Sequence, residues 1–325
     1  MRYPTLSELP PALGKTGWPW TVESSRCPPT LPNGEPWPSL SIVIPSFQQG
    51  PFIEESIRSV LLQGYPNLEC IVTDGGSKDG TVEVLRKYDQ WLSFWVSEPD
   101  AGQTDAVCKG FVKATGQLLG IMCGDDYYLP EGLQKLAKAK MARPGIVAAA
   151  GACPEMDLAG KFVKSIRPYI RDRATLGDWG VEAWFPAVAC LFDAAAFRQV
   201  GGFDRRFRSA NDVELWVRLA RVGDFALLDE DVSIARYNLD SVSRRDPAGE
   251  ITALIALNYL NGYSAVAKAI LERHATTRIC EGTAEVAAAR IFKSFGLRAL
   301  VKPLLAQLAG AFRQKFFGYF RPGSR

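Results

Sequence analysis

The sequence predicts an α/β fold in which a mostly parallel central sheet is flanked by helices and followed by a C-terminal helical appendage. From Ser41 onward, short runs of β-branched residues alternate with stretches of helical periodicity, which is the pattern of βαβ units in parallel sheets. Polar and Gly-rich motifs stand where these runs end, as expected where ligands bind beside such a sheet. From Glu250 the chain is Ala-rich and helical in pattern, which predicts an appendage rather than a second enzyme.

Composition limits the class of protein. With 325 residues, of which 47% are hydrophobic and 22% charged, the chain is expected to fold around one large core or two smaller ones. Its 38 basic and 35 acidic residues leave a net charge of +3, which is too balanced to indicate nucleic acid as a partner.

Cysteine usage and hydropathy indicate the compartment. The seven cysteines form no C-x-x-C pair, and most lie in apolar stretches, where small core residues are expected. This favours a reducing cytosol without disulfides or structural zinc. No apolar leader follows Met1, and no apolar run approaches the roughly 18 residues that span a bilayer. We therefore expect a cytoplasmic protein without a transmembrane segment.

Residues 1–39 form a predicted N-terminal arm. They contain nine prolines, which exclude a helix and favour extended backbone. Trp18, Trp20 and Trp37 are interleaved with the prolines. These tryptophans could clamp the arm onto the domain or present it to a partner, and the sequence favours the clamp.

The alternating pattern after the arm predicts individual elements. Strands are expected at 41–44, 70–73, 94–96 and 118–123, and helices at 53–63, 79–88 and 103–114. Beyond Pro130 we expect a helix at 131–142, a strand at 146–150, an apolar segment at 187–192 and a helix at 212–222. Ligands bind at the carboxyl ends of parallel strands. Three motifs should converge at that edge: Pro45-Ser46, Asp74-Gly75-Gly76 and Gly124-Asp125-Asp126.

Asp125 and Asp126 follow directly after the apolar run 118–123. Burying an unpaired carboxylate costs several kcal/mol, so acids just beyond an interior strand usually face a cation, a hydroxyl or a transferable proton. A loop with two solvated acids is the alternative that this motif alone leaves open.

The segment 74–81 joins a strand end to a helix through three glycines, which let the backbone turn with positive φ and approach a ligand closely. It matches neither the G-x-G-x-x-G fingerprint nor the P-loop, which makes a dehydrogenase or a P-loop NTPase a poor fit. Asp74 could accept hydrogen bonds from a base edge. Asp79 is expected to cap the next helix at Thr81.

Four motifs resemble, in order and spacing, the family 2 glycosyltransferases of GT-A fold. They are 41–47, 73–81, 99–106 and 124–128, and the resemblance covers roughly residues 16–245. It implies a GT-A domain at 40–245, with a nucleotide-sugar-binding half (40–130) and an acceptor-binding half (131–245), and a helical, basic extension at 246–325. It also implies a nucleotide-diphosphate-sugar donor, a divalent metal (Mn²⁺ or Mg²⁺) and inversion at the anomeric carbon.

The resemblance also implies roles for the residues of the first half. The leaving diphosphate gains negative charge that a hard cation with oxygen ligands can stabilise. Asp126 matches the metal ligand, and Asp125 lies nearer the ribose or the donor sugar. Asp74 matches the acid that reads the nucleobase, while Pro45 and Ser46 offer backbone contacts to the same nucleoside.

Asp100, Gln103 and Asp105 stand at the start of a predicted helix. Contact with the donor and stabilisation of the helix N-terminus are both open roles for them.

Inversion by direct displacement needs a base that takes the proton of the acceptor hydroxyl. Segments 201–204 and 210–218 resemble the acceptor side of the family, where the acid before the Trp-containing helix is the base; Asp212 is the matching residue. Its alternative role is a helix N-cap. Glu214 is the fallback base, and Arg218 could pair with it or with a diphosphate.

One segment departs from the family pattern. Many relatives have an Arg-x-His segment whose histidine helps to hold the metal or the diphosphate, and here Asn238 replaces that histidine. Asparagine can still donate a hydrogen bond or ligate weakly through oxygen, so metal affinity is affected more than activity. The single histidine, His274, lies in the appendage. The Gln-x-x-Arg-Trp motif of processive synthases is absent, which favours transfer of a single sugar.

The C-terminal extension is strongly basic. Eight Lys and Arg residues and no acid follow Glu285, beside an apolar helical stripe. Residues 286–325 could therefore lie on an anionic membrane surface, pack on the domain or mediate self-association. The first arrangement would make the protein peripheral on the inner face of the cell membrane.

These inferences predict an inverting, metal-dependent hexosyl- or N-acetylhexosaminyltransferase. Its substrates would be a nucleotide-diphosphate sugar and a saccharide or lipid-linked acceptor, in cell-surface polysaccharide or lipopolysaccharide biosynthesis. A sugar-nucleotide nucleotidyltransferase is the enzymatic alternative, although residues 45–50 lack the Gly-rich, Arg-bearing loop it usually needs. A catalytically degenerate nucleotide-sugar-binding protein is the other alternative, supported only by the missing histidine.

Overall fold

A computed structural model describes residues 4–12, 14–172, 176–178, 181–237, 247–263, 265–267 and 269–270. The chain divides into two compact units. The first contains Met1–Ile170, Trp184–Arg205 and Leu215–Asn238, and the second contains Arg171–Ala183, Arg206–Glu214 and Leu239–Arg325. The central sheet belongs to the first unit.

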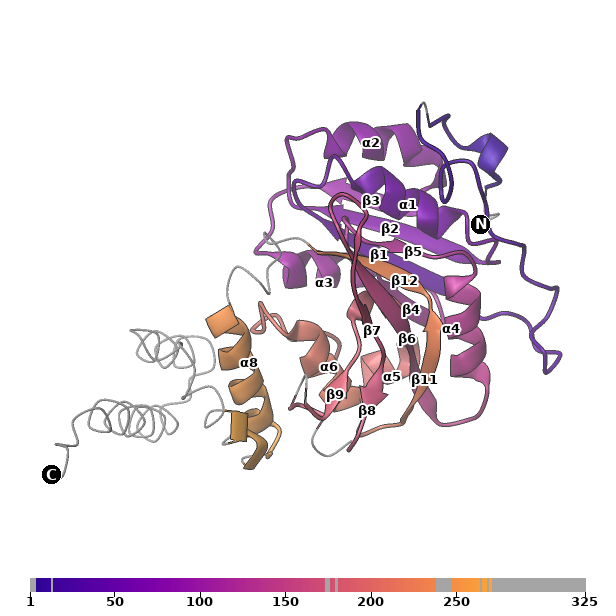
Figure 1. Ribbon diagram of the computed structural model, residues 1–325. Coiled ribbons are helices and arrows are strands. Elements are labelled where there is room, and N and C mark those ends of the chain that lie inside the picture. Colours follow the sequence, from indigo (N-terminus) through magenta and orange to yellow (C-terminus); the bar gives the residue numbers. More distant parts are fainter. Residues whose placement is uncertain are drawn as a thin grey trace, which may run out of the picture. The chain divides into compact units, whose positions relative to one another are not determined.

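Four parallel strands form one side of the sheet, in the order β3-β2-β1-β4 (Figure 1). They are β1 (Leu40–Ser46), β2 (Leu68–Asp74), β3 (Phe94–Ser97) and β4 (Leu118–Ile121). Each coincides with a predicted strand to within a few residues. Their inner positions are largely apolar, and β1 is buried along its whole length, as expected for a strand covered on both faces.

The other side of the sheet is mixed. It contains β5 (Tyr127–Tyr128), β6 (Ile146–Asp157), β7 (Phe162–Ile166), β10 (Cys190–Asp193), β11 (Asp224–Asp231) and β12 (Ser233–Tyr237). β11 and β12 pair in parallel with β6, whereas β10 is antiparallel to β4 and β6. β5 and β7 are also antiparallel to their partners. The predicted α/β class is confirmed, with parallel pairing concentrated in the first half.

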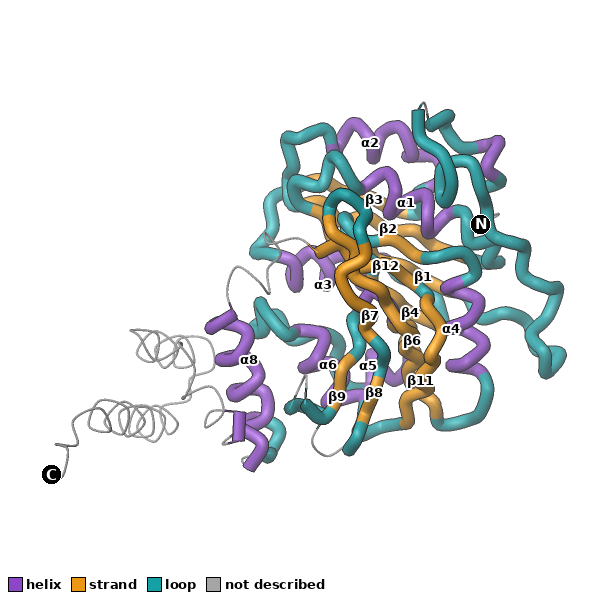
Figure 2. Tube along the Cα trace, viewed as in Figure 1, coloured by secondary structure: helices purple, strands orange, loops and turns teal. Residues whose placement is uncertain are grey.

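Helices cover both faces of the parallel strands. The chain moves outward from β1 through α1 (Ile53–Leu61) to β2 and through α2 (Thr81–Tyr88) to β3, then returns through α3 (Gln103–Lys113) to β4. Because such crossovers are right-handed, the reversal puts α3 on the opposite face from α1 and α2. Figures 1 and 2 show α1 and α2 above these strands and α3 below. In the second half, α4 (Gly132–Met141) packs on β6, β10 and β11, and α5 (Ala194–Gln199) packs on β10.

The side chains of β1 alternate between the two covered faces. Leu40, Ile42 and Ile44 belong to the core cluster that includes residues of α1 and α4. Val43 faces α3, where Gly110 leaves room for it. A Cβ added to Gly110 would lie 2.3 Å from Val43 Cγ1, so α3 approaches β1 this closely only because residue 110 has no side chain.

The N-terminal arm is clamped onto the first unit, as predicted. Apart from the 3₁₀ turn η1 (Leu6–Glu8), its described part is irregular. Trp18 Nε1 donates to the carbonyl oxygen of Tyr128 over 2.7 Å. Arg58 of α1 is 1% exposed and donates to the carbonyl oxygens of Pro10 (2.9 Å) and Pro19 (3.0 Å). The arm therefore completes the hydrogen bonding of a buried cation on α1.

The remaining elements are α6 (Asn211–Leu219), α8 (Pro247–Leu260) and two short strands outside the central sheet, β8 (Tyr169–Ile170) and β9 (Ala183–Trp184). In the second unit, Asn258 of α8 is fully buried and donates to the carbonyl oxygen of Gly177 over 2.9 Å. Among the described residues, none of the helices combines the length and apolarity needed to cross a bilayer. Residues 286–325, assigned above to membrane binding or self-association, lie outside the described part.

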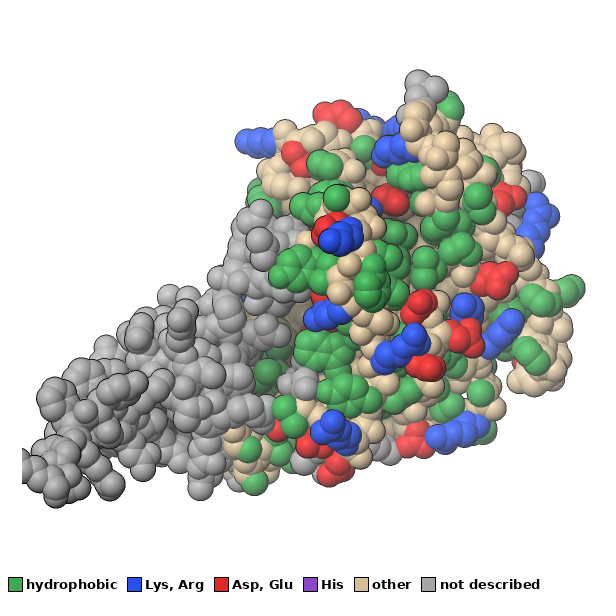
Figure 3. Space-filling view, in the orientation of Figure 1, with side chains coloured by type: hydrophobic (Ala, Val, Ile, Leu, Met, Phe, Trp, Pro, Cys, Tyr) green, Lys and Arg blue, Asp and Glu red, His purple; other side chains and the backbone are tan. Residues whose placement is uncertain are grey.

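Surface charges of opposite sign are intermixed. Figure 3 shows basic and acidic side chains side by side over the described part of one face. Exposed ion pairs include Lys135–Glu230 at 3.4 Å and Arg143–Asp224 at 2.9 Å. Such pairs contribute little to stability, so the fold depends on the apolar contacts on both faces of the sheet.

Candidate active site

The three polar motifs meet at the carboxyl edge of the parallel strands. Ser46 and Asp74 are register partners at the ends of β1 and β2, and Ser97 of β3 pairs with Asp74. Beyond β4, the amide of Met122 still donates to the carbonyl oxygen of Val43 over 3.0 Å. The two acids follow this last sheet contact, so the predicted convergence is confirmed.

Residues 123–126 form a tight turn, referred to below as the acidic turn. The amide of Asp126 donates to the carbonyl oxygen of Cys123 over 3.1 Å. Ser56 Oγ of α1 lies 3.0 Å from the carbonyl oxygen of Gly124 and 2.5 Å from that of Asp126. The backbone of the turn is thus fixed both by its own hydrogen bond and by α1.

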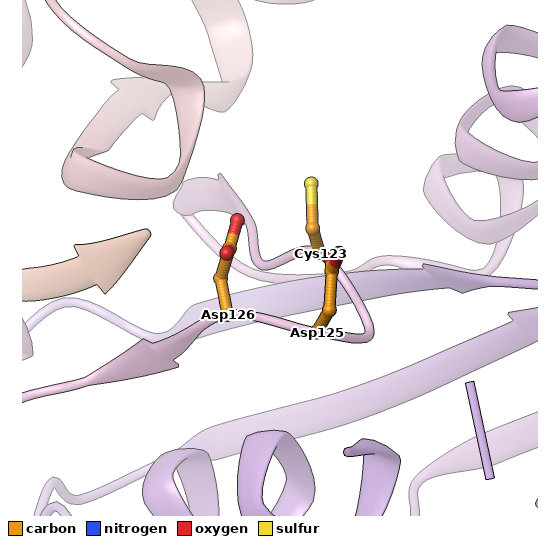
Figure 4. A group of neighbouring side chains, drawn as sticks. All are labelled: Cys123, Asp125 and Asp126. Atoms are coloured by element: carbon orange, nitrogen blue, oxygen red, sulfur yellow. The ribbon is translucent and has the colours of Figure 1, made fainter. Parts of the chain in front are cut away.

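Three side chains of this turn offer metal ligands (Figure 4). One ligand atom from each of Cys123, Asp125 and Asp126 lies within 4.8 Å of the others. Two atoms bound to one ion at about 2.0–2.4 Å are at most about 4.8 Å apart, so this spacing suits a shared cation. Carboxylate oxygens are the ligands that Mn²⁺ and Mg²⁺ prefer. Asp126, the predicted metal ligand, therefore lies among side chains that suit a cation. Cys123 is one of them, and the sequence did not indicate it.

Asp126 is 8% exposed. Burial and the neighbouring charge of Asp125 raise the pKa of Asp126 well above its ordinary value, while the backbone amide and positive charge of Arg236 oppose this shift. A bound divalent cation would stabilise the ionised carboxylate of Asp126, as the charge of Arg236 does, and would therefore also lower this pKa.

Arg236 of β12 also holds the acidic turn. Its backbone amide donates to Asp126 Oδ1 over 2.7 Å, and its Nη1 donates to the carbonyl oxygen of Asp125. Its Nη2 lies 2.5 Å from Glu55 Oε2. The guanidinium also lies between the rings of Phe52 (5.0 Å) and Tyr127 (5.1 Å). Arg236 is therefore a positioning residue for the turn, a role the sequence analysis did not find.

Asp74 organises the loop that follows β2. It is 2% exposed, and Oδ2 accepts hydrogen bonds from Gly76 N (3.1 Å), Ser77 N (2.8 Å) and Ser97 Oγ (2.6 Å). Oδ1 accepts from Ser77 Oγ over 2.5 Å. A carboxylate has about four acceptor positions, so most of its capacity is used within the protein. Its reading of a nucleobase stays a prediction.

Asp79 holds the start of α2, as expected. Its Oδ1 accepts from the amide (3.2 Å) and hydroxyl (2.7 Å) of Thr81, and its Oδ2 accepts from the amide of Gly50 over 2.8 Å. These bonds lower the pKa of Asp79 against the opposing effect of burial, which is the largest single influence.

Phe47 is an exposed aromatic residue at this edge that the sequence analysis did not assign. Its side chain is 61% exposed. It lies beside Gly75, where an added Cβ would be 3.1 Å from Phe47 Cδ2 and 2.9 Å from Asp100 Oδ2. Phe47 could have been identified from the sequence, because it is an aromatic residue that directly follows the Pro-Ser end of a buried strand.

Pro45 and Ser46 end β1 beside Thr73 and Asp74. Ser46 is 5% exposed, and its Oγ has no hydrogen-bond partner among the described residues. A buried hydroxyl of this kind is available to a ligand at the strand ends.

The start of α3 lies next to the acidic turn. Gln103 Nε2 is 3.6 Å from Cys123 Sγ. Asp100 Oδ1 accepts from the amide of Gly102 over 2.7 Å, and Asp105 Oδ2 accepts from the amide of Ala101 over 3.3 Å. The two acids thus stabilise the helix start, whereas Gln103 reaches the acidic turn.

Asp212 and Glu214 lie in the first turn of α6 and belong to the second unit. Burial raises the pKa of Asp212, and the amide of Val213, which donates to Asp212 Oδ1 over 2.9 Å, opposes that shift. A raised carboxyl pKa suits a general base. Glu214 is 4% exposed. The catalytic role of either acid stays a prediction.

Arg218 supports a turn within the first unit. Its Nη1 donates to the carbonyl oxygen of Val200 over 2.6 Å, and its Nη2 donates to that of Gly202 over 2.7 Å. These bonds give Arg218 a structural role, and its pairing with Glu214 or with a diphosphate stays a prediction. Asn238 and His274 lie outside the described residues.

Comparison with known proteins identifies the family. Residues 41–195 match the family model described as Glycosyl transferase family 2. An uncharacterized glycosyltransferase of Rickettsia typhi is 24% identical over 241 residues, which cover 73% of this chain and 72% of that protein. An uncharacterized glycosyltransferase of Mycobacterium tuberculosis is 29% identical over 187 residues, or 57% of this chain and 70% of that protein. TuaG of Bacillus subtilis, whose name assigns it to teichuronic acid biosynthesis, is 30% identical over 109 residues, or 33% of this chain and 43% of TuaG.

Solved structures share the fold. TarS 1–349 of S. aureus in complex with UDP-GlcNAc has a TM-score of 0.62 at 15% identity, over 86% of this chain and 91% of that chain. The mannosyltransferase PcManGT of Pyrobaculum calidifontis, in complex with GDP-Man and Mn²⁺, has a TM-score of 0.51 at 16% identity, over 86% of this chain and 88% of that chain. Residues 41–195 therefore form a glycosyl transferase family 2 domain, and the chain adopts the GT-A fold.

Proposed function

We propose that this glycosyltransferase moves a single sugar from a nucleotide-diphosphate sugar to a hydroxyl of a saccharide or lipid-linked acceptor, with a divalent metal and with inversion. The acidic turn carries the proposal, because it gathers metal-ligand side chains at the edge where a GT-A sheet binds its nucleotide. UDP-GlcNAc in TarS and GDP-Man with Mn²⁺ in PcManGT support a hexosyl or N-acetylhexosaminyl donor. The name of TuaG supports a role in surface-polysaccharide assembly.

In this proposal the donor lies along the carboxyl edge of β1, β2 and β4. Asp126 and Asp125 hold Mn²⁺ or Mg²⁺, which when bound offsets the charge that develops on the leaving diphosphate. The exposed ring of Phe47 offers a stacking surface for the nucleobase beside the Asp74 loop. The unpartnered hydroxyl of Ser46 can bond the nucleoside, and Gln103 can contact the diphosphate or the sugar.

Asp212 is proposed as the base for the acceptor. Its carboxylate takes the proton of the acceptor hydroxyl, the oxygen forms a bond to the anomeric carbon, and the bond from that carbon to the diphosphate oxygen breaks. Burial raises the pKa of Asp212, which increases its proton affinity. Glu214 is the second candidate for this step.

The test is a donor screen with purified protein and Mn²⁺, followed by variants. Nucleotide-sugar hydrolysis or transfer should be lost in Asp126→Asn, whereas Asp212→Asn should keep donor binding by calorimetry and lose transfer. The matched control is Asp229→Asn, because the Asp229 side chain is 88% exposed in a surface ion pair. Turnover equal to wild type in both site variants would overturn the proposal.

The alternatives make different predictions in the same experiment. Family membership favours glycosyl transfer over nucleotidyl transfer. A nucleotidyltransferase would release pyrophosphate from a nucleoside triphosphate and a sugar phosphate. A degenerate binding protein would bind a nucleotide sugar with Mn²⁺ and give neither hydrolysis nor transfer.

A further inference from the structure

We infer that the sulfur of Cys123 is a metal ligand beside Asp125 and Asp126, so that the site selects cations that accept both sulfur and oxygen. Such cations are Co²⁺, Zn²⁺ and Cd²⁺, in contrast to Mg²⁺. The inference rests on the proposed function, because it takes the acidic turn as the metal centre of the transferase.

The spacing of the donor atoms supports the inference. Cys123 Sγ lies within 4.8 Å of a carboxylate oxygen of Asp125 and of Asp126. Metal–sulfur bonds of about 2.3 Å and metal–oxygen bonds of about 2.0–2.2 Å put two ligands of one ion at most about 4.5 Å apart. Figure 4 shows that the three side chains leave the same short turn. A small rotation of the side chains is therefore enough to bring all three atoms to one ion.

The backbone around Cys123 is fixed. Its carbonyl oxygen accepts the hydrogen bond from Asp126 N, and the next carbonyl in the turn is 3.0 Å from Ser56 Oγ. The backbone from which the thiol projects is therefore held in place, so only the side chain needs to turn.

The surroundings of Cys123 also differ from those of the core cysteines. Gln103 Nε2 is 3.6 Å from its sulfur, and an amide donor at that position stabilises a sulfur ligand from outside the coordination sphere. Cys123 is partly exposed, whereas Cys70 and Cys153 are buried, and burial raises the pKa of each of these two thiols to about 12. Those cysteines are inert packing residues. Cys123, in contrast, lies beside the carboxylates of Asp125 and Asp126.

A sulfur ligand changes which cation binds best. Three anionic donors would face one divalent ion, and the thiol proton is released to solvent when the sulfur binds. Magnesium demands oxygen ligands in near-octahedral geometry and keeps several waters. We therefore expect the Mg²⁺ complex to use the two carboxylates only, and the Co²⁺ and Cd²⁺ complexes to use the sulfur as well.

The test uses Co²⁺ as a spectroscopic probe on the full-length protein. Wild type with Co²⁺ should give a near-ultraviolet sulfur-to-cobalt absorption band, and Cys123→Ser should lose this band while still binding Co²⁺. The matched control is Cys108→Ser, which removes a partly exposed thiol of α3 and should keep the band. By calorimetry, Cys123→Ser should weaken Cd²⁺ binding at least about tenfold and leave Mg²⁺ binding unchanged.

A second measurement follows the thiol itself. Alkylation of Cys123, detected by mass spectrometry, should slow when Cd²⁺ is added and should not slow with Mg²⁺. Co²⁺ bound by wild type without the band, or equal alkylation in all conditions, would overturn the sulfur ligand. If Mn²⁺-dependent transfer then still disappeared in Asp126→Asn, the proposed function would stand without it. Failure of wild type to bind Co²⁺, together with metal-independent turnover, would overturn both.

Discussion

Arg236 Nη2 lies 2.5 Å from Glu55 Oε2, and this ion pair joins β12 to α1 directly beside the acidic turn. The side chains are 12% and 18% exposed, so water screens the pair only weakly. The same arginine bonds Asp126 Oδ1 and the carbonyl oxygen of Asp125 through its amide and guanidinium. Glu55 thus fixes the guanidinium that holds the backbone of the turn at Asp125.

The first prediction concerns this ion pair. Glu55→Gln leaves the guanidinium without its counter-ion, so the turn should lose its fixed geometry. We expect the Kd for Mn²⁺ to rise about 10- to 100-fold, with a comparable fall in kcat/KM, as is common for residues behind metal ligands. The control is Glu83→Gln, which removes an exposed pair with Arg86 at 3.8 Å. Unchanged Mn²⁺ affinity in Glu55→Gln would show that the pair does not position the turn.

Phe47 gives the second prediction. Base–aromatic stacking is worth about 1–3 kcal/mol, so Phe47→Ala should raise the donor KM about 5- to 150-fold. Phe47→Trp should retain most of the affinity. Because the ring is 61% exposed, the melting temperature should hardly change. The control is Val112→Ala at a residue that is 79% exposed on α3, and a KM change of the same size there would contradict a specific stacking role.

The third prediction tests the packing of α3 on β1. Gly110→Ala adds a Cβ at 2.3 Å from Val43 Cγ1. Overpacking of this kind costs about 1–3 kcal/mol, which exceeds the roughly 1 kcal/mol that alanine gains over glycine in a helix. Denaturant unfolding should therefore show a net loss of stability. The double variant Gly110→Ala/Val43→Ala should be more stable than the sum of the single changes predicts, and strict additivity would contradict the close contact.

The fourth prediction concerns pH. Burial raises the pKa of Asp212, so the folded protein binds this proton more tightly than the unfolded chain does. The stability linked to it is present below the unfolded pKa of about 3.9 and is lost as pH rises through the folded pKa. Asp212→Asn has no such loss. Its melting temperature should therefore rise relative to wild type as pH rises through that window and then level off.

The same group should control the pH dependence of transfer. Because the base must be ionised, kcat/KM of the wild type should fall on acidification with an apparent pKa above that of an ordinary aspartate. Asp229→Asn, at an exposed position, should follow the wild-type profile in both measurements. A melting difference for Asp212→Asn that does not vary with pH would contradict the raised pKa.

The parallel half of the sheet could be predicted because its strands are continuous apolar runs. β1 is buried at every residue, and such a run followed by a helical period is distinctive. β7 is exposed at four of its five residues, so no apolar pattern marks it. β5, β8, β9, β11, β12 and α5 were missed as well, since short or half-exposed elements carry little local signal.

Some residues of the candidate site could be predicted from the sequence, and others could not. Asp126 could be identified because two acids after a buried strand are costly unless they have a partner. The Arg236 contact with Asp126 joins residues 110 positions apart, and no local pattern encodes such a pair. Cys123 ends the apolar run 118–123, where nothing marks it as a ligand, and its position beside two carboxylates is visible only once the turn is folded.

Helix α1 contacts both the N-terminal arm and the acidic turn. Arg58 binds carbonyl oxygens of the N-terminal arm, while Ser56 binds the acidic turn and Ser59 Oγ accepts from the amide of Tyr128 over 3.1 Å. The family match begins at residue 41, after the arm. A shortened protein starting there would keep every ligand proposed for the donor, yet the buried guanidinium of Arg58 would lose three of its acceptors, the carbonyl oxygens of Pro10, Pro19 and Trp20. The stretch that matches the family model therefore begins later in the chain than the residues that complete the hydrogen bonding of α1.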